Sequence, residues 1–375
     1  MTDSPTQPPP RPARIGAPRF GAAQIRLLER LCNACAVSGD ETEVRRIVLE
    51  QVKPYASEVR VDALGNLLAY CPAAGAPHLR VLVAAHMDEV GLMLTGDEGD
   101  GFFRFTAIGG VDVRCLPGKS LQVGREHLPA LIGLNPFHLA SDHEVRSVPS
   151  IDDLRIDVGP DNAKKVKVGD WAAFTTPFAR LGPSLRAKAL DDRIGVATLI
   201  ELVHNPPPHL DLVAAFTVQE EVGLRGASVA AYSAQPDLAF VLDCTPARDL
   251  PAWDSGSPGD QPSQNARYNT RLGAGPAIYI ADADSMADPR LVRHLIETAE
   301  ALGLPYQLRQ PGGDGTDAGA IHLQRAGIPS VSLAVPGRYL HTPAGIVRLS
   351  DWKNTLALIQ AALLRLTPDI LTLER

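Results

Sequence analysis

The chain has 375 residues, a length that fits about two domains or one large domain with an insertion. Hydrophobic residues make up 45% of the sequence, which is enough for a packed core and excludes wholesale disorder. The formal net charge of −7 argues against a dedicated nucleic-acid-binding protein. No segment reaches the roughly 18 consecutive apolar residues of a membrane-spanning helix, so we expect no membrane partner either.

The N-terminal region, residues 1–21, contains six prolines and three arginines but no apolar segment. We therefore expect a disordered or extended tail there rather than a secretory signal. The chain has five cysteines, an odd number without a disulfide framework, which favours a reducing cytoplasm. Because Cys32 and Cys35 share helical spacing with Ile25 and Leu28, we interpret them as part of a helix face rather than as a redox or zinc pair.

Helices and strands alternate along the remaining chain. We expect a helix over residues 22–36, and a second helix that begins after the capping-box pair Ser38 and Glu41. A strand pair is expected across residues 59–70. Continuous apolar runs, typical of strands covered on both faces, occupy residues 80–85, 212–218, 238–242 and 330–335. Further helical patterns occupy residues 193–205, 288–303 and 350–366. This order predicts an α/β fold with a mainly parallel sheet sandwiched by helices.

One long segment, residues 97–184, interrupts this alternation. It contains short strand-like runs and many glycines, with little helical periodicity. We expect a small β-barrel-like domain here, inserted into an α/β domain formed by residues 22–96 and 185–375. Residues 253–275 are rich in Gly, Ser, Pro and Asn and are expected to form a long surface loop.

Residues that could bind metal stand at the ends of the predicted strands or at the start of a helix: His86, Asp191, Asp192, Glu220, Glu221, Asp243 and His341. Individually each has an ordinary explanation, such as a helix cap or a solvated surface carboxylate. In open α/β sheets, however, the carboxyl ends of the strands meet where ligands bind. Carboxylates gathered there would repel one another unless cations compensated them. The mixture of nitrogen and oxygen ligands favours a pair of zinc, cobalt or manganese ions.

Local spacing suggests further roles. Asp88 lies two residues after His86, so in extended chain both side chains point the same way, and Asp88 can accept the second imidazole N–H. Glu220 and Glu221 are adjacent, so their side chains should diverge. One of them can ligate a metal while the other acts on the metal-bound water as general base and then general acid.

The motifs around these residues resemble one family. The segments AHMDEVG, ALDDR, QEEVGLRGA, VLD, GTDA and RYLHTP occur in the order found in the co-catalytic metallo-aminopeptidases. That family includes glutamyl, deblocking and tetrahedral aminopeptidases, and some members known as cellulase-M-like endoglucanases. The resemblance extends from about residue 27 to residue 366 and implies the phosphorylase/hydrolase-like fold of di-zinc peptidases.

The resemblance also implies a role for each matching residue. His86, Asp191 and Asp243 would hold one metal, and Asp191, Glu221 and His341 the other, which makes Asp191 the bridge. The preference for Asp191 over Asp192 rests on the family pattern alone. Glu220 would be the general base and Asp88 the orienting residue. Thr316 and Asp317 either line the site or form a glycine turn capped by the aspartate.

These inferences predict a cytoplasmic metallo-aminopeptidase that removes N-terminal residues from peptides. A hydroxide bridging two divalent ions, Zn²⁺ or Co²⁺, would attack the scissile carbonyl with Glu220 as base. In relatives the inserted domain serves dimerisation and higher assembly, so we expect a homo-oligomer, either a dimer or a tetrahedral dodecamer. An N-acyl amidohydrolase or deacylase on the same scaffold, an endoglucanase-like member, and a non-enzymatic scaffold are the alternatives. The preferred N-terminal residue is left open.

Overall fold

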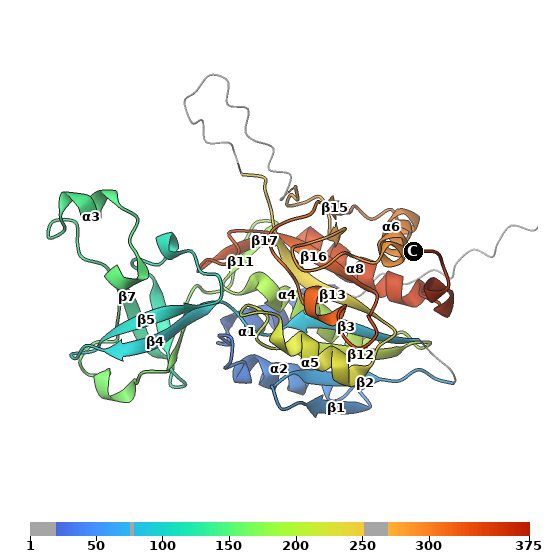
Figure 1. Cartoon of the computed structure of the whole chain (residues 1–375), viewed down its shortest axis with the longest axis horizontal. Helices are drawn as coiled ribbons and strands as arrows, with labels where there is room; N and C mark the ends of the chain where they lie inside the picture. Colours follow the sequence, from blue (N-terminus) through green and yellow to red (C-terminus); the bar gives the residue numbers. More distant parts are fainter. Residues whose placement is uncertain (1–19, 76–78, 251–268) are drawn as a thin grey trace, which may run out of the picture.

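A computed structural model describes residues 20–75, 79–250 and 269–375. Most of the expected N-terminal tail (1–21) and most of the expected loop (253–275) lie outside these described ranges. The described chain forms an α/β domain and a separate β-barrel domain that extends from one side of it (Figure 1). No helix of the described ranges is both long enough and apolar enough to cross a bilayer.

The α/β domain is built on an 11-stranded sheet whose centre is parallel and whose edges are antiparallel. Its main path is β1 (Glu58–Val61), β2 (Leu67–Cys71), β12 (Asp211–Thr217), β3 (Arg80–His86), β13 (Leu238–Pro246), β16 (Ser330–Arg338), β17 (Gly345–Arg348), β11 (Ser184–Ala187) and β10 (Ala179–Leu181). Two further strands, β14 (Ala277–Tyr279) and β15 (Gln307–Arg309), join beside β16. Strands β12, β3, β13 and β16 are mutually parallel. The α/β fold is confirmed. The sheet is mixed rather than mainly parallel, because short connections add antiparallel strands at both edges.

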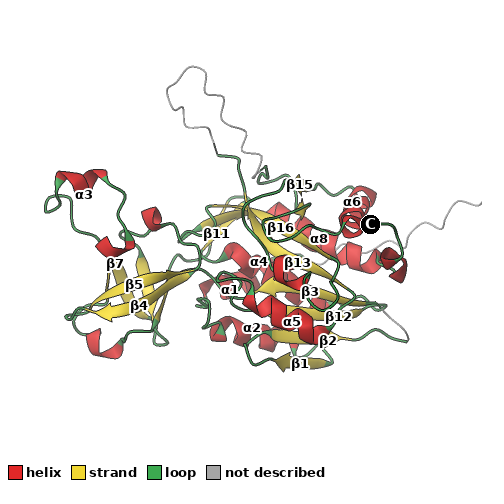
Figure 2. Ribbon diagram, in the orientation of Figure 1, coloured by secondary structure: helices red, strands yellow, loops and turns green. Residues whose placement is uncertain are grey.

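Helices cover both faces of this sheet (Figure 2). One face packs against α1 (Ala22–Asn33), α2 (Thr42–Val52), α4 (Leu190–His204), α6 (Pro289–Leu302) and α8 (Leu349–Arg365). The other face packs against α5 (Arg225–Ala234) and α7 (Ala318–Ile321). In β3, Val81 and Val83 belong to the first core and Leu82 to the second. Burying each such side chain contributes about 1.5–3 kcal/mol, which explains why this strand is apolar throughout.

The first helix is shorter than the sequence predicts. It ends at Asn33, and Ala34 has an extended backbone with ψ of 150°. The Lys188 ammonium donates a hydrogen bond to the Ala34 carbonyl, which replaces continued helical pairing. Cys32 is buried on the helix face as expected, but Cys35 lies beyond the helix.

The second domain is a closed six-stranded barrel. Its strands in order are β4 (Gly91–Asp97), β5 (Phe102–Ile108), β8 (Arg155–Asp157), β7 (Leu128–Gly133), β6 (Ser120–Val123) and β9 (Trp171–Phe174). The short α3 (Asp142–Arg146) lies at the end of the barrel domain away from the α/β domain (Figure 1). Short 3-10 turns in the described ranges include Val113–Cys115, Ile151–Asp153, Ala163–Lys165 and Pro368–Leu371.

The barrel occupies a slightly different range from the expected insert at 97–184. Its first strand already begins at Gly91, because Leu92 and Leu94 bury their side chains in the barrel core. Its last strand ends at Phe174. Strands β10 and β11 then pair with the main sheet through β17, so they belong to the α/β domain.

Candidate active site

Four parallel strands and one helix start bring the predicted ligands to one edge of the main sheet. His86 is the last residue of β3, Asp243 lies near the end of β13, and Glu221 lies in the turn after β12. Asp191 stands at the start of α4, and His341 follows β16. These five residues line one cavity of about 440 Å³, together with Glu220. The fold therefore brings these residues together at the carboxyl ends of the central strands.

Asp191 lies between two groups of donor atoms. Its Oδ1 is 3.2 Å from Nε2 of His86, and the same nitrogen is 3.9 Å from Oδ1 of Asp243. Its Oδ2 is 3.6 Å from Nε2 of His341, which is in turn 3.4 Å from Oε2 of Glu221. Each carboxylate oxygen of Asp191 thus faces a different histidine, the arrangement that a bridging ligand between two ions requires.

The side chain of Asp88 positions the turn that carries the two glutamates. It is fully buried. Its Oδ1 accepts the Glu220 backbone N–H at 3.0 Å, and its Oδ2 accepts the Glu221 backbone N–H at 3.2 Å and the Ser38 hydroxyl at 2.7 Å. By contrast, Oδ1 is 3.6 Å from Nδ1 of His86, which is beyond hydrogen-bond length. Nδ1 of His86 is buried without a partner. The sequence spacing of Asp88 and His86 did not predict that Asp88 holds the turn that carries Glu220 and Glu221.

The electrostatics of the cavity favour bound cations. Burial raises the pKa of Glu221 to about 7, assisted by the Asp191 charge. Burial and the Asp191 and Asp192 carboxylates raise the pKa of Asp243 well above its ordinary value. Burial alone lowers the pKa of His86, but the neighbouring Glu220 charge and the hydrogen bond to Asp191 raise it well above its usual value. Because these groups have an excess of negative charge, divalent ions would stabilise their ionised forms, and the donor set fits such ions.

Three other expected residues lie around this centre. Asp192 is buried, and its Oδ1 accepts the Gly195 N–H at 2.9 Å while Oδ2 has no partner. Asp317 is buried and accepts the Thr217 hydroxyl. Thr316 is buried too, with its hydroxyl 2.8 Å from that of Ser332. Burial raises the pKa of Asp317 to about 6. Neither Thr316 nor Asp317 is among the residues that line the cavity wall.

Sequence reasoning missed a buried ion-pair network behind the site. Glu89 is buried and pairs with Lys188 at 2.8 Å and with Arg193 at 3.0 Å. Arg193 also donates to the Asp88 carbonyl. The network therefore joins the segment after β3 to the start of α4. Glu89 and Arg193 stood inside the recognised motifs, but neither is a ligand type that the strand-end argument could single out.

The outer wall of the cavity was also not foreseen. Asp284, Asp314, Gly315, Leu224 and Leu340 line it beyond the predicted ligands. The Asp314 carboxylate pairs with the buried Arg309 guanidinium. These residues come from loops, where periodicity carries no information. Leu224, Gly315 and Leu340 belonged to recognised motifs, but the motifs assigned them no role. A group that occupies the cavity beside the predicted metal ligands would contact this wall.

A family model of M42 glutamyl aminopeptidases matches residues 65–358. The chain belongs to the M42 glutamyl aminopeptidase family. It is therefore an aminopeptidase and a metallopeptidase, and the expected family, hydrolase class and fold are confirmed. Membership in M42 also implies divalent metal ions. Among the described residues, three overlapping sets of side chains at the sheet edge bring potential metal ligands together: His86 with Asp192 and Asp243, His86 with Asp191 and Glu221, and Asp191 with Asp192 and Cys244.

Relatives support this membership over most of the chain. A putative aminopeptidase from Acetivibrio thermocellus is 33% identical, over 90% of this chain and 97% of the relative. An aminopeptidase structure from Desulfurococcus kamchatkensis is similar with a TM-score of 0.85 and 34% identity, covering 93% of this chain and 96% of that one. The TET1 peptidase of Pyrococcus horikoshii, which can assemble into a tetrahedron or a large octahedral shell, has a TM-score of 0.78 and 33% identity, covering 92% and 100%.

Proposed function

We propose that this M42 peptidase removes N-terminal residues from peptides with two divalent ions, Zn²⁺ or Co²⁺. His86, Asp191 and Asp243 would hold one ion, and Asp191, Glu221 and His341 the other. The observation that carries this proposal is the position of Asp191, whose two oxygens face different histidines. When bound, such ions polarise the scissile carbonyl and lower the pKa of water.

Glu220 is the proposed general base and then general acid. Its carboxyl group lines the cavity beside the metal-binding residues. Burial, together with the charges of Glu221 and Asp317, raises its pKa well above its ordinary value. A carboxylate with a raised pKa accepts a proton from water more readily near neutral pH and can return it to the leaving amine. Asp88 positions this residue by holding its backbone N–H.

The test combines a metal assay with a single substitution. Chelation should abolish turnover of aminoacyl-anilides, and Zn²⁺ or Co²⁺ should restore it. Glu220→Gln should lower kcat by about 10²–10⁴-fold while the metal content is unchanged. Glu201→Gln is the matched control, because Glu201 lies in α4 and is not among the residues lining the cavity. Equal turnover by the Glu220→Gln protein would refute the proposed base.

The substrate proposal has its own discriminating experiment. An aminopeptidase needs a free α-amino group, so N-acetylated aminoacyl-anilides should not be cleaved. If the blocked substrate were cleaved as fast as the free one, the alternative of an N-acyl amidohydrolase or deacylase would replace the aminopeptidase proposal. The metal ligands would be the same in both cases, so this result would not affect them.

We also propose that the protein forms a homo-oligomer in the cytoplasm. The barrel domain carries exposed apolar side chains around α3, among them Leu134, Phe137 and Leu139. Such a patch is typical of a protein interface, and the Pyrococcus horikoshii relative assembles. The five cysteines are free, as is usual in a reducing compartment. Light scattering should give a dimer or a dodecamer, and a monomer at micromolar concentration would contradict this part.

A further inference from the structure

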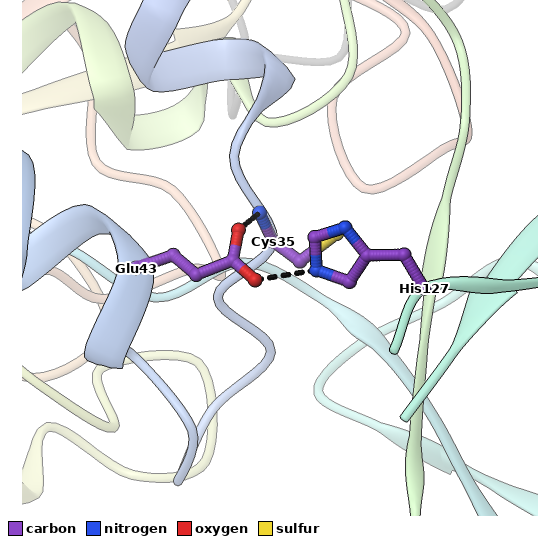
Figure 3. A group of neighbouring side chains, drawn as sticks. All are labelled: Cys35, Glu43 and His127. Atoms are coloured by element: carbon purple, nitrogen blue, oxygen red, sulfur yellow. Dashed lines mark hydrogen bonds and ion pairs between the residues drawn. The ribbon is translucent and has the colours of Figure 1, made fainter. Parts of the chain in front are cut away.

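A second group of metal-binding side chains lies between the two domains. It consists of Cys35, Glu43 and His127 (Figure 3), whose potential ligand atoms all lie within 4.8 Å of one another. Cys35 follows α1 and Glu43 stands in the first turn of α2, whereas His127 lies in the turn between β6 and β7. Residues of the α/β domain and of the barrel therefore meet at one point, although they are far apart in sequence.

Several contacts already hold the three side chains in place. The Cys35 backbone N–H donates to Oε2 of Glu43 at 3.0 Å, and Oε1 of Glu43 contacts Nε2 of His127. The Cys35 thiol donates to Oε1 of Gln122 at 3.2 Å. Because these side chains are oriented by contacts in the folded chain, little further ordering is needed for them to bind an ion.

The group opens into a cavity of about 260 Å³, lined also by Asp40, Arg46, Arg125 and Trp171. The side chains of Glu43 and His127 are 33% and 36% exposed, so an ion from solvent can reach them. Arg46 and Arg125 are exposed, and their flexible side chains can turn toward water. This cavity has no lining residue in common with the peptidase cavity.

We propose that Cys35, Glu43 and His127 form a zinc site that links the barrel to the α/β domain. A thiolate, an imidazole nitrogen and a carboxylate oxygen are the ligands that Zn²⁺ prefers. On binding, Cys35 releases its thiol proton to solvent, the neutral ring of His127 supplies a nitrogen, and the fourth position faces the cavity. The charges of the thiolate and of Glu43 then balance the dication. This site is independent of the proposed function.

The proton released by the thiol makes zinc binding pH-dependent. An ordinary cysteine thiol has a pKa of about 8.5, so zinc must displace a proton when it binds Cys35 at neutral pH. Affinity should therefore fall about tenfold for each pH unit of acidification. A site of carboxylates alone would show a much shallower dependence above pH 6.

Cobalt provides the decisive experiment because a cobalt–thiolate bond has a near-ultraviolet charge-transfer band. The full-length protein is loaded with Co²⁺ and compared with Cys35→Ser and His127→Asn. Asparagine tolerates the left-handed backbone of His127, where φ is 52°. Cys115→Ser is the matched control, since Cys115 is a partly buried cysteine of the barrel segment. Cys244→Ala controls for the buried thiol beside the peptidase cavity.

The band should be present in the unsubstituted protein and in both controls, absent from Cys35→Ser, and weakened in His127→Asn. Elemental analysis should find one zinc ion fewer in Cys35→Ser than in the unsubstituted chain. If Cys35→Ser fails to fold, Glu43→Gln replaces it in both measurements, with a weakened band and a lower zinc content as the expected result. Persistence of the band in Cys35→Ser, or equal zinc contents, would overturn the proposal. The expected ligands of the peptidase cavity include no thiol, so failure of the proposed function would leave the band unchanged.

Discussion

Replacing Asp88 by asparagine tests how the turn with the two glutamates is positioned. The carboxylate accepts hydrogen bonds from Ser38 and from the backbone N–H groups of Glu220 and Glu221. Asparagine has the same shape but offers only one acceptor oxygen. In either orientation of the amide, its NH₂ group faces at least one backbone N–H. The turn must therefore shift, and the Glu220 carboxyl group shifts with it.

The size of the effect follows from the hydrogen bonds that asparagine cannot accept. A hydrogen bond to a charged group contributes roughly 1.5–3 kcal/mol. If the loss of one such bond is expressed fully in the transition state, kcat/KM falls between about 10-fold and about 150-fold, because about 1.36 kcal/mol corresponds to a factor of ten. Any part of the lost hydrogen-bond free energy that does not lower kcat/KM should lower the free energy of unfolding.

The assay measures kcat/KM for an aminoacyl-anilide and, separately, unfolding by denaturant. Asp288→Asn is the matched control, because Asp288 is also a buried aspartate with backbone and side-chain partners but lies at the start of α6. It should lose stability and keep its kcat/KM. If Asp88→Asn retained the kcat/KM of the unsubstituted protein, the positioning role of the carboxylate would be refuted.

Three further substitutions test other parts of the structure. His341→Asn should lower the content of divalent ions by about one per chain, measured by elemental analysis; an unchanged content would contradict its role as a ligand. Burial opposes ionisation of Asp288, but its hydrogen bonds with Arg290 lower its folded pKa. The stability difference between the unsubstituted protein and Asp288→Asn arises from the charged hydrogen bonds with Arg290 and should be about 1.5–3 kcal/mol. It should be complete above about pH 4 and disappear as the pH falls through the folded pKa; a difference that did not change with pH would contradict this origin. Lys188→Met removes one of the two cationic partners of buried Glu89 while Arg193 remains, so it should lower the free energy of unfolding by about 1.5–3 kcal/mol, measured by denaturant titration; a loss under about 1 kcal/mol would contradict this.

The sequence predicted the centre of the fold because its strands have an unusual composition. In a run such as residues 80–85, the side chains that point to either face of the sheet are apolar. A strand has this pattern when helices cover both faces of its sheet, which is typical of central strands. The β1–β2 pair at one edge follows the strand pair expected across residues 59–70. The other antiparallel edge was harder to predict because β10 and β17 are short and partly exposed. Such strands are determined by pairing with a neighbour, which a local pattern does not reveal.

The predicted ligands could be found because each is tied to the end of a recognisable element. The role of Asp88 could not be predicted in this way. Its spacing from His86 shows that both side chains point in the same direction, but not that the backbone N–H groups of Glu220 and Glu221 lie closer to Asp88 than the His86 ring does. The Cys35 group shows the same limit. Cys35 has helical spacing with Leu28, yet the helix ends at Asn33, and His127 approaches it only through the packing of the barrel.

The ion pair between Glu89 and Lys188 has a consequence for folding order. These residues close a loop of about 100 residues that contains the whole barrel, and closing a flexible loop of that length costs about 4 kcal/mol of chain entropy. A barrel that folds first shortens the effective loop, because its first and last strands, β4 and β9, are paired neighbours. Once the barrel has folded, the ion pair closes only a short junction, so most of that entropy cost is met by pairing within the barrel rather than by the ion pair.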